Sequence, residues 1–464
     1  MENNNVLATA PVGKLLLKLS IPTLLAQLVN LLYSVIDRIY VSRIPVVGTD
    51  ALGGLGVTFP IIMLISAFSA LVGMGGAPRA AIYMGKGDNE KAEKILGNCV
   101  TMLILISIVL SGIFFLTKEP IILTFGGSDV TLPYANSYLS IYLLGTIFVQ
   151  IALGLNTFIT TQGFATISMI TVCIGAVLNI ILDPIFIFGL KLGVKGAALA
   201  TIISQGVCAI FVLAFLTGKK SKLKIRAKNL TLSPKIALPI LALGLAPFIM
   251  QSTECLIQLV FNKSVKFYGN DNYVALMTIL FTAMQLIFMP LQGFTQGAQP
   301  IISYNYGAKN FDRVKKTFSL LLKSALTMTV IFVGIIELFP SFFLKVLTPD
   351  PIIQEMGVVP LRVFMFGMML MGAQTACQTA FLAIGEAKSS MFLALLRKIV
   401  LLLPLALIIP RLFNLGIKGV FLAEPISDII AITITLIYFY SVRDKFFSDN
   451  SKSQKQGQNI AKQA

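Results

Sequence analysis

Histidine is absent from this chain of 464 residues, and only 12% of its residues are charged. Without histidine, the chain lacks the commonest metal ligand and the usual proton carrier near neutral pH. Average soluble domains carry about 25% charged residues, whereas this chain is 56% hydrophobic and has a mean hydropathy of +0.86. A water-exposed surface does not tolerate this balance, so the composition predicts an integral membrane protein.

Signatures of catalysis are also missing. The sequence contains no Walker A sequence, no Gly-x-Ser-x-Gly elbow and no HExxH, so we expect neither an enzyme nor a cofactor. The opening residues lack the basic region that begins a cleavable signal peptide. Five cysteines lie in apolar stretches without CxxC or metal-ligand spacing, and we interpret them as small core residues: Cys99, Cys173, Cys208, Cys255 and Cys377.

Long apolar runs dominate what is present. A membrane-spanning helix needs about 20 mostly apolar residues, and the chain contains twelve such segments. The predicted fold class is therefore an all-α integral membrane protein with twelve transmembrane helices. The segments cover 15–42, 51–74, 95–117, 134–160, 165–188, 193–217, 236–267, 273–298, 317–340, 354–383, 389–410 and 416–441.

Lysine and arginine collect in three of the even-numbered connections between these segments. The connection 218–235 holds seven basic residues, and 76–94 and 299–316 hold four each, whereas the odd-numbered connections hold at most two. By the positive-inside rule, this pattern predicts a multi-pass protein of the cell (plasma) membrane with both termini cytoplasmic. The net charge of +17 then follows from topology and attraction to the lipid bilayer. We expect a monomer without a nucleic-acid partner.

Internal similarity divides the chain into two halves. Two stretches of the first half recur in the second at offsets of 222 and 223 residues, and a pair of glycines shares the offset of 222. Three agreeing matches rarely arise by chance, so we interpret the halves as homologous. The matches are GMGGAPRAAIYMGKGDNEKAEK (73–94) with GFTQGAQPIISYNYGAKNFDRVKK (293–316), LGVKGAALATIIS (192–204) with LGIKGVFLAEPIS (415–427), and Gly163 with Gly385.

The duplication predicts the domain organisation. We expect an N-lobe of residues 1–217 and a C-lobe of residues 236–442, joined by a cytoplasmic basic linker (218–235) and followed by a cytoplasmic tail (443–464). Each half has six predicted spans, so both halves enter the membrane from the same side and the repeat is parallel. Two fused six-helix bundles indicate a transporter. The alternative, a non-transporting channel or receptor, leaves the duplication unexplained.

Several of these segments resemble the multidrug and toxic compound extrusion (MATE) family. The resemblance implies a 6+6 fold and a secondary active multidrug efflux antiporter, which exports organic cations or other toxic compounds in exchange for H⁺ and/or Na⁺ by alternating access. The alternative is a flippase for a lipid-linked precursor, which predicts a basic cleft, and intramembrane basic residues are few. The matching stretches are GAQPIISYNYGAKN (297–310), VLNIILDPIFIFG (177–189) and GVFLAEPISD (419–428), and LLYSVIDRIYVSRI (31–44) is similar to the first helix of the DinF-type branch.

Two carboxylates lie inside predicted spans of the N-half. A charge at the centre of a membrane helix costs about 2.5–3.5 kcal/mol on insertion scales, so such a residue is a functional candidate. Asp37 shares a helix face with Asn30 and Tyr33, and Asp183 shares one with Asn179. Two neighbouring carboxylates in a low-dielectric interior do not both stay ionised, so one becomes a proton acceptor. Their oxygens also suit Na⁺. A buried salt bridge at Asp37 is the structural alternative.

The resemblance assigns roles to residues of the N-half. It implies a cation-coupling site, which in the sodium case is a Na⁺ site, built from two aspartates, an asparagine and a threonine. Two further polar residues match the lining of the same cavity. The choice between H⁺ and Na⁺ stays open. The coupling residues are Asp37, Asn179, Asp183 and Thr201, and the lining residues are Tyr33 and Asn156.

The first helix of the C-half has polar residues of its own and lacks the counterpart of Asp37. Glu254 and Gln258 lie one turn apart in the seventh span and are candidates for the substrate cavity. When Pro22 is matched to Pro247, at an offset of 225, the position of Asp37 becomes Asn262, so the two halves have diverged there.

Charges of both signs lie in the last two predicted spans. Glu424 and Asp428 share a face of the twelfth span, and Arg397 and Lys398 lie in the eleventh. Either base could pair with either acid, and the sequence leaves that pairing open.

Overall fold

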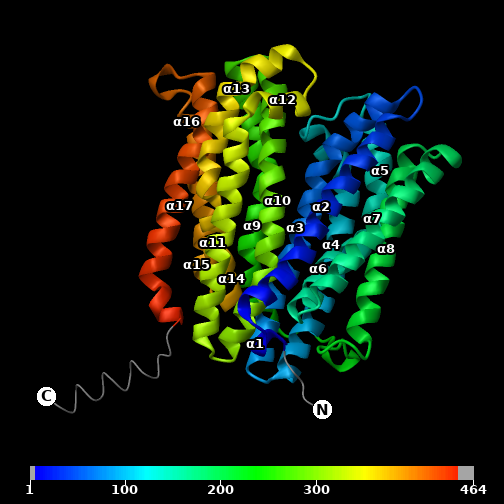
Figure 1. Cartoon of the computed structure of the whole chain (residues 1–464). Coiled ribbons are helices and arrows are strands. Elements are labelled where there is room, and N and C mark those ends of the chain that lie inside the picture. Colours follow the sequence, from blue (N-terminus) through cyan, green and yellow to red (C-terminus); the bar gives the residue numbers. More distant parts are fainter. Residues whose placement is uncertain (1–5, 448–464) are drawn as a thin grey trace. The chain divides into compact units, whose positions relative to one another are not determined.

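The computed structural model describes residues 6–447 and is built of helices (Figure 1). Eleven helices are long and apolar enough to cross a membrane, and the pair α5 and α6, bent by 60°, forms a twelfth broken span. The twelve-helix prediction is confirmed. Residues 448–464, most of the predicted tail, lie outside the described part. The helices are α1 (Val6–Thr9), α2 (Val12–Ser42), α3 (Gly48–Gly85), α4 (Asn89–Thr124), α5 (Leu132–Leu144), α6 (Thr146–Thr161), α7 (Ala165–Pro184), η1 (Ile185–Gly189), α8 (Val194–Thr217), η2 (Ala227–Asn229), α9 (Pro234–Tyr268), α10 (Asp271–Gly307), α11 (Phe311–Leu338), α12 (Pro340–Leu347), α13 (Pro351–Phe366), η3 (Gly367–Leu370), α14 (Met371–Ile384), α15 (Ala387–Leu395), η4 (Leu396–Leu402), α16 (Leu403–Ile408), η5 (Leu412–Asn414) and α17 (Ile417–Phe447).

Three predicted spans are interrupted in ways that the apolar runs do not reveal. The span predicted at 134–160 breaks at Gly145, where a side chain would collide with Ile202 of α8. The spans predicted at 165–188 and 389–410 contain the π-helices η1 and η4. Each π-helix lies next to a proline, Pro184 or Pro404, which removes a backbone donor from the helical ladder. π-helical turns concentrate at functional sites.

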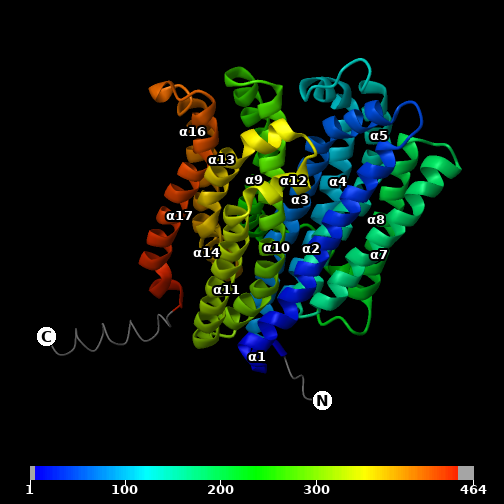
Figure 2. The same cartoon turned by 45° about the horizontal axis from the view of Figure 1, so that its top comes forward.

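The helices form two compact units. The first consists of Leu19–Ala80 and Asn89–Leu256, and the second consists of the chain up to Lys18, Ala81–Asp88 and the chain from Ile257 onward. The boundaries fall inside α2, α3 and α9, so each of these helices contributes to both units. Within the first unit, α7 and α8 run side by side (Figure 2).

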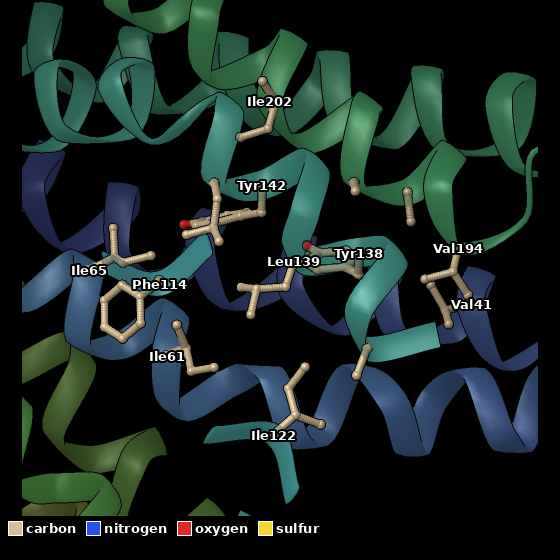
Figure 3. Close-up of a cluster of buried hydrophobic side chains, with 14 of the residues drawn as sticks. Val41, Ile61, Ile65, Phe114, Ile122, Tyr138, Leu139, Tyr142, Val194 and Ile202 are labelled. Carbon is tan, nitrogen blue, oxygen red and sulfur yellow. The ribbon is translucent and has the colours of Figure 1, made fainter. Parts of the chain in front are cut away.

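A buried apolar cluster stabilises the first unit. Figure 3 shows side chains from α2, α3, α4, α5 and α8 gathered in one layer. The rings of Tyr138 and Tyr142 stack with centroids 6.2 Å apart, one turn apart on α5. These tyrosines extend the cluster to the polar residues described below. The labelled side chains are Val41, Ile61, Ile65, Phe114, Ile122, Tyr138, Leu139, Tyr142, Val194 and Ile202.

Helices α3 and α10 cross closely within the second unit, and the internal repeat relates the residues on the two sides of the crossing. A Cβ atom on Gly85 would collide with the carbonyl oxygen of Tyr304, and a Cβ atom on Gly307 would collide with that of Ile82. Gly85 and Gly307 are 222 residues apart, and so are Ile82 and Tyr304. The crossing of α3 and α10 is therefore symmetric, and only glycine permits this approach of the two backbones.

The basic linker is ordered against the first unit. The Oε1 atom of Gln162 accepts hydrogen bonds from the backbone N–H groups of Lys222 (2.7 Å) and Leu223 (2.9 Å). Glu93 forms an ion pair with Arg226 at 2.7 Å. Two buried polar side chains, on α4 and after α6, thus hold the connection between the halves.

Candidate functional site

The two predicted aspartates of the N-half meet inside the first unit. Asp183 is fully buried at the end of α7, and Asp37 is half-buried on α2. Their carboxyl groups are close enough to interact with one another. A carboxylate has no donor, so two carboxyl groups form a hydrogen bond only when one carries a proton. The pair can therefore hold one proton between them.

An amide connects this pair to the neighbouring helix. The Nδ2 atom of Asn179 lies 3.4 Å from Oδ1 of Asp183 and 3.5 Å from the hydroxyl of Thr201. Asn179 and Asp183 are one turn apart, so they share a face of α7. The hydroxyl of Thr201 donates to the backbone carbonyl of Ala197 at 3.0 Å and interacts with the hydroxyl of Tyr138. The four predicted coupling residues converge on one point.

Local sequence explains why Asp183 ends its helix there. Pro184 follows it and begins the transition from α7 to the π-helix η1. The wider π-helical turn changes the direction of the residues that follow, while Asp183 keeps its α-helical position relative to Asn179.

Several buried oxygens of this region accept no hydrogen bond from the described residues. Buried polar atoms usually have a hydrogen-bond partner, so these oxygens are available to a ligand. Carboxylate, amide and hydroxyl oxygens are the ligands that a hard cation prefers. The oxygen set suits Na⁺, and a carboxylate can also take up a proton. Within residues 6–447, no group of three or more Cys, Asp or Glu side chains could hold a metal ion. The atoms are Oδ1 of Asp37, Oδ1 of Asn156, Oδ1 of Asn179, Oδ2 of Asp183 and Oγ of Ser204.

A small cavity opens beside the pair. Its volume is about 50 Å³, and a water molecule needs roughly 10–15 Å³ by this measure. A few waters or a hydrated ion therefore fit, whereas a drug-sized ligand occupies a pocket of about 300–1,000 Å³. The lining consists of Asn30, Tyr33, Ala152, Leu153, Asn156, Thr171, Val172, Gly175, Ala176, Asn179, Thr201, Ser204, Gln205 and Cys208.

The cavity matches the sequence prediction only in part. Tyr33 and Asn156, which the resemblance named, both line it. Gly175, Gln205 and Cys208 also line it, and sequence reasoning missed their contribution. A signal existed for Gln205, which follows Thr201 by one helical turn. Glycine and cysteine in an apolar helix carry no such signal, because they look like core residues.

Arg38 does not neutralise its neighbour Asp37 by an ion pair. Its guanidinium group lies over the ring of Phe59, 5.3 Å from the centroid. This agrees with the expectation that adjacent helical residues point in different directions.

The candidate residues of the C-half differ in their burial and in their ion pairs. Glu254 is half-buried on α9 and is not among the residues that line the cavity. Gln258 is half-buried on the same helix. Arg397, by contrast, is paired with both acids of the twelfth span: its Nε atom lies 2.9 Å from Oδ1 of Asp428, and its Nη2 atom lies 3.7 Å from Oε1 of Glu424. Of the pairings left open by the sequence, the structure shows those of Arg397, which contacts both acids.

Comparisons with known proteins agree with this fold. The chain is similar to the multidrug export protein MepA of Staphylococcus haemolyticus (strain JCSC1435), with 26% identity over 446 residues, 94% of this chain and 95% of that protein. MepA of Staphylococcus aureus (strain NCTC 8325 / PS 47) is 25% identical over 448 residues, 96% of this chain and 97% of that protein.

Solved structures share the fold. A crystal structure of MATE in complex with MaD3S superposes with a TM-score of 0.88 at 24% identity, covering 96% of this chain and 99% of that chain. A transporter of the MOP superfamily from Pyrococcus furiosus superposes with a TM-score of 0.89 at 23% identity, covering 97% of this chain and 100% of that chain.

A family model identifies the chain directly. The MatE model matches it twice, over residues 22–185 and 247–408, once in each of the halves that internal similarity defined. The two matches begin at Pro22 and Pro247, the prolines that were paired by sequence. Together they cover well over half of the chain, which therefore belongs to the MatE family of membrane transporters.

Proposed function

We propose that this protein is a secondary active multidrug antiporter, which exports cationic, amphipathic small molecules in exchange for H⁺ and/or Na⁺. The curated relatives are named multidrug export proteins, and the chain spans nearly all of their length. One observation carries the proposal: Asp37 and Asp183 come from different helices and meet in a buried, polar part of an otherwise apolar unit. Such intramembrane acids typically mark ion pathways.

Coupling follows from the charge of this pair. With a carboxylate ionised, a cationic substrate is stabilised in the low-dielectric interior. When a proton or Na⁺ enters from outside, it neutralises the carboxylate, and the substrate cation loses its electrostatic partner. Asn179 and Thr201 supply an amide and a hydroxyl to the bound ion. Exchange then requires only that ion and substrate favour different states of the protein.

Alternating access is the second part of the proposal. The cavity of about 50 Å³ is too small for a substrate and an ion together, so the state with substrate bound must be more open. Tyr33 and Asn156 line the cavity and are the side chains proposed to contact the substrate. The N-lobe (1–217) and C-lobe (236–442) are the parts that rearrange, with the linker 218–235 between them.

The proposed setting is the plasma membrane, with a monomer whose termini are both cytoplasmic. Single cysteines introduced into 218–235 should react with an impermeant thiol reagent only from the cytoplasmic side, and a cysteine near Lys191 only from outside. A cytoplasmic reaction near Lys191 would contradict this topology.

Everted membrane vesicles test the transport reaction. Their lumen corresponds to the cell exterior, so an inside-acid or inside-high-Na⁺ gradient should drive ethidium into the lumen. Imposing each gradient alone distinguishes the two coupling ions. Absence of ethidium movement under both gradients, at normal protein levels, would contradict the proposal. It would favour the alternative, a flippase for a lipid-linked precursor, although Arg397, a base that such a substrate would need, is already paired with two acids.

A further inference from the structure

A second group of buried charges lies in the C-half, outside the site described above. Arg397 and Lys398 on η4 are 3% and 4% exposed, and Glu424 and Asp428 on α17 are 1% and 0% exposed. We call these residues the C-half quartet. Its formal charges sum to zero. The guanidinium of Arg397 bridges the two acids, at 2.9 Å from Asp428 and 3.7 Å from Glu424.

The internal repeat aligns the helices that carry the quartet with the helices that line the N-half cavity. Gly163 and Gly385, at an offset of 222, both have positive φ angles, 91° and 83°. Gly193 and Gly416, at an offset of 223, have φ angles of 56° and 53°. The turns before each pair of helices thus have the same backbone form, which supports the two offsets at those turns.

These offsets assign the quartet to the cavity positions of the N-half. Each of the four N-half counterparts lines the cavity. The C-half therefore carries charged side chains at positions whose N-half counterparts are small or uncharged residues lining the cavity. The pairs are Gly175 with Arg397, Ala176 with Lys398, Thr201 with Glu424 and Gln205 with Asp428.

The residue that packs beside Gly175 in the N-half is replaced by a smaller one in the C-half. A Cβ atom on Gly175 would lie 2.5 Å from Sγ of Cys208, so the N-half has no room for a side chain there. The counterpart of Cys208, at an offset of 223, is the buried Ala431. The smaller side chain leaves space on the side where the C-half accommodates Arg397.

We propose that Glu424 and Asp428 form a site for a monovalent cation that the protein occupies with its own guanidinium group. Two buried carboxylates need a compensating charge in a low-dielectric interior, and a tethered arginine supplies one that cannot leave. The C-half is therefore unable to exchange an ion. Removing the charge of Arg397 converts the quartet into a site for Na⁺ or a proton. The comparison with the N-half rests on the proposed function, but the C-half site does not.

Further contacts hold η4 and η3 against α17 near the quartet. The hydroxyl of Ser427 reaches the backbone carbonyl of Arg397 at 3.4 Å. Gly367 of η3 lies close to the same part of α17, since a Cβ atom on it would be 2.5 Å from Cα of Pro425. Oδ2 of Asp428 is buried and accepts no hydrogen bond from the described residues, so one oxygen remains for an added cation.

The test measures thermal unfolding of purified full-length protein with the N-half aspartates replaced (Asp37→Asn/Asp183→Asn). In this parent, Arg397→Gln should unfold at a temperature roughly 5 °C higher in saturating NaCl than in choline chloride of equal ionic strength. Acidification in choline chloride should give a similar rise if the ligand is a proton. The parent should show neither effect.

A matched control removes the acids as well. Arg397→Gln/Glu424→Thr/Asp428→Gln carries the N-half residues at both acidic positions, and it should lose the dependence on Na⁺ and on pH. The proposal is overturned if Arg397→Gln unfolds identically in both salts at both pH values, or fails to fold in all of them. It is also overturned if the control keeps the dependence. Because the readout is stability, failure of transport would not affect this result.

Discussion

Between α7 and α8, the N-half keeps a cavity of about 50 Å³ next to two carboxylates that contact one another. At the matching positions of the C-half, four charged side chains pack together with almost no exposure. Both arrangements satisfy the same electrostatic requirement, since buried carboxylates need a positive charge. The difference is whether that charge can leave. Under the proposed function, the duplicated scaffold carries one exchangeable and one fixed counter-charge, and only the first would couple to an ion gradient.

Removing the exchangeable charge should have the largest effect. We expect Asp37→Asn and Asp183→Asn each to abolish gradient-driven efflux while the protein inserts and folds normally, since asparagine keeps the size and hydrogen bonding of aspartate. The two side chains share one charge state, so the double variant should be little worse than either single variant, a coupling of about 0.5–3 kcal/mol. Ethidium transport in vesicles at equal protein level measures this.

Resistance like that of the unchanged protein in both single variants would exclude this site. A double variant that is much worse than either single one would mean that the aspartates act independently.

Disrupting the fixed charge should affect stability more than transport. Arg397→Gln removes the guanidinium that pairs with both buried acids, and breaking a buried pair of this kind costs about 3–5 kcal/mol. Adding Glu424→Thr and Asp428→Gln should recover most of that loss, because a neutral core of similar volume is often as stable as a buried ion pair. Denaturant titration of purified protein measures both.

Efflux by the triple variant is the discriminating measurement. Retained gradient-driven transport would agree with a coupling site confined to the N-half. Loss of transport at recovered stability would mean that the C-half quartet takes part in coupling.

Much of this comparison was accessible from the sequence, because it depends on local patterns. Long apolar runs defined the spans, and the one-turn spacing of Asn179 and Asp183 put them on one face. The meeting of Asp37 with Asp183 needed the family resemblance, since the two residues lie on separate helices. The bend at Gly145 was not accessible, because it depends on contact with Ile202 from a distant part of the chain.

The small residues of the cavity were missed for a related reason. Gly175 and Cys208 occur in apolar helices, where a tightly packed position and a cavity wall look the same. The pairing of Arg397 was an open choice between two acids, and the structure resolves it because the side chain is long enough to contact both. Sequence patterns report the composition of a face, but only packing decides whether the face encloses space.

The crossing of α3 and α10 offers a symmetric test of the two halves. Gly85→Ala and Gly307→Ala each place a methyl group against a backbone carbonyl, and overpacking of this kind costs about 1–3 kcal/mol. We expect similar losses in the unfolding free energy for the two variants. The matched controls are Gly112→Ala and Gly334→Ala, also 222 residues apart, where a Cβ atom meets nothing within 4 Å.

The controls should be neutral or slightly stabilising, since alanine favours a helix over glycine by about 0.5–1 kcal/mol. Unequal losses for Gly85→Ala and Gly307→Ala would show that the crossing is not energetically symmetric.

Glu254 distinguishes the first helix of the C-half from that of the N-half. With Pro22 matched to Pro247, its counterpart is Val29, so the acid belongs to one half only. We expect Glu254→Gln to weaken export of some substrates while cation-driven transport stays measurable. Efflux rates for several cationic dyes, measured in parallel, test this. Complete loss for every dye at normal expression would move the main coupling site out of the N-half.

The smallest expected effect concerns the hydrogen bonds between Gln162 and the linker 218–235, which have no counterpart in the C-half. Gln162 accepts hydrogen bonds from the N–H groups of Lys222 and Leu223, whereas its counterpart at an offset of 222 is Ile384. Gln162→Ile should leave both amides without their acceptor, at about 1 kcal/mol for a typical intramolecular hydrogen bond. Hydrogen exchange at these two amides should therefore accelerate several-fold, with gradient-driven efflux retained. Gln162→Glu keeps an oxygen acceptor and should exchange as slowly as the unchanged protein. Unaltered exchange in Gln162→Ile would mean that the remaining contacts, among them the Glu93–Arg226 ion pair at 2.7 Å and the Ser233–Asn98 hydrogen bond, hold the linker without Gln162.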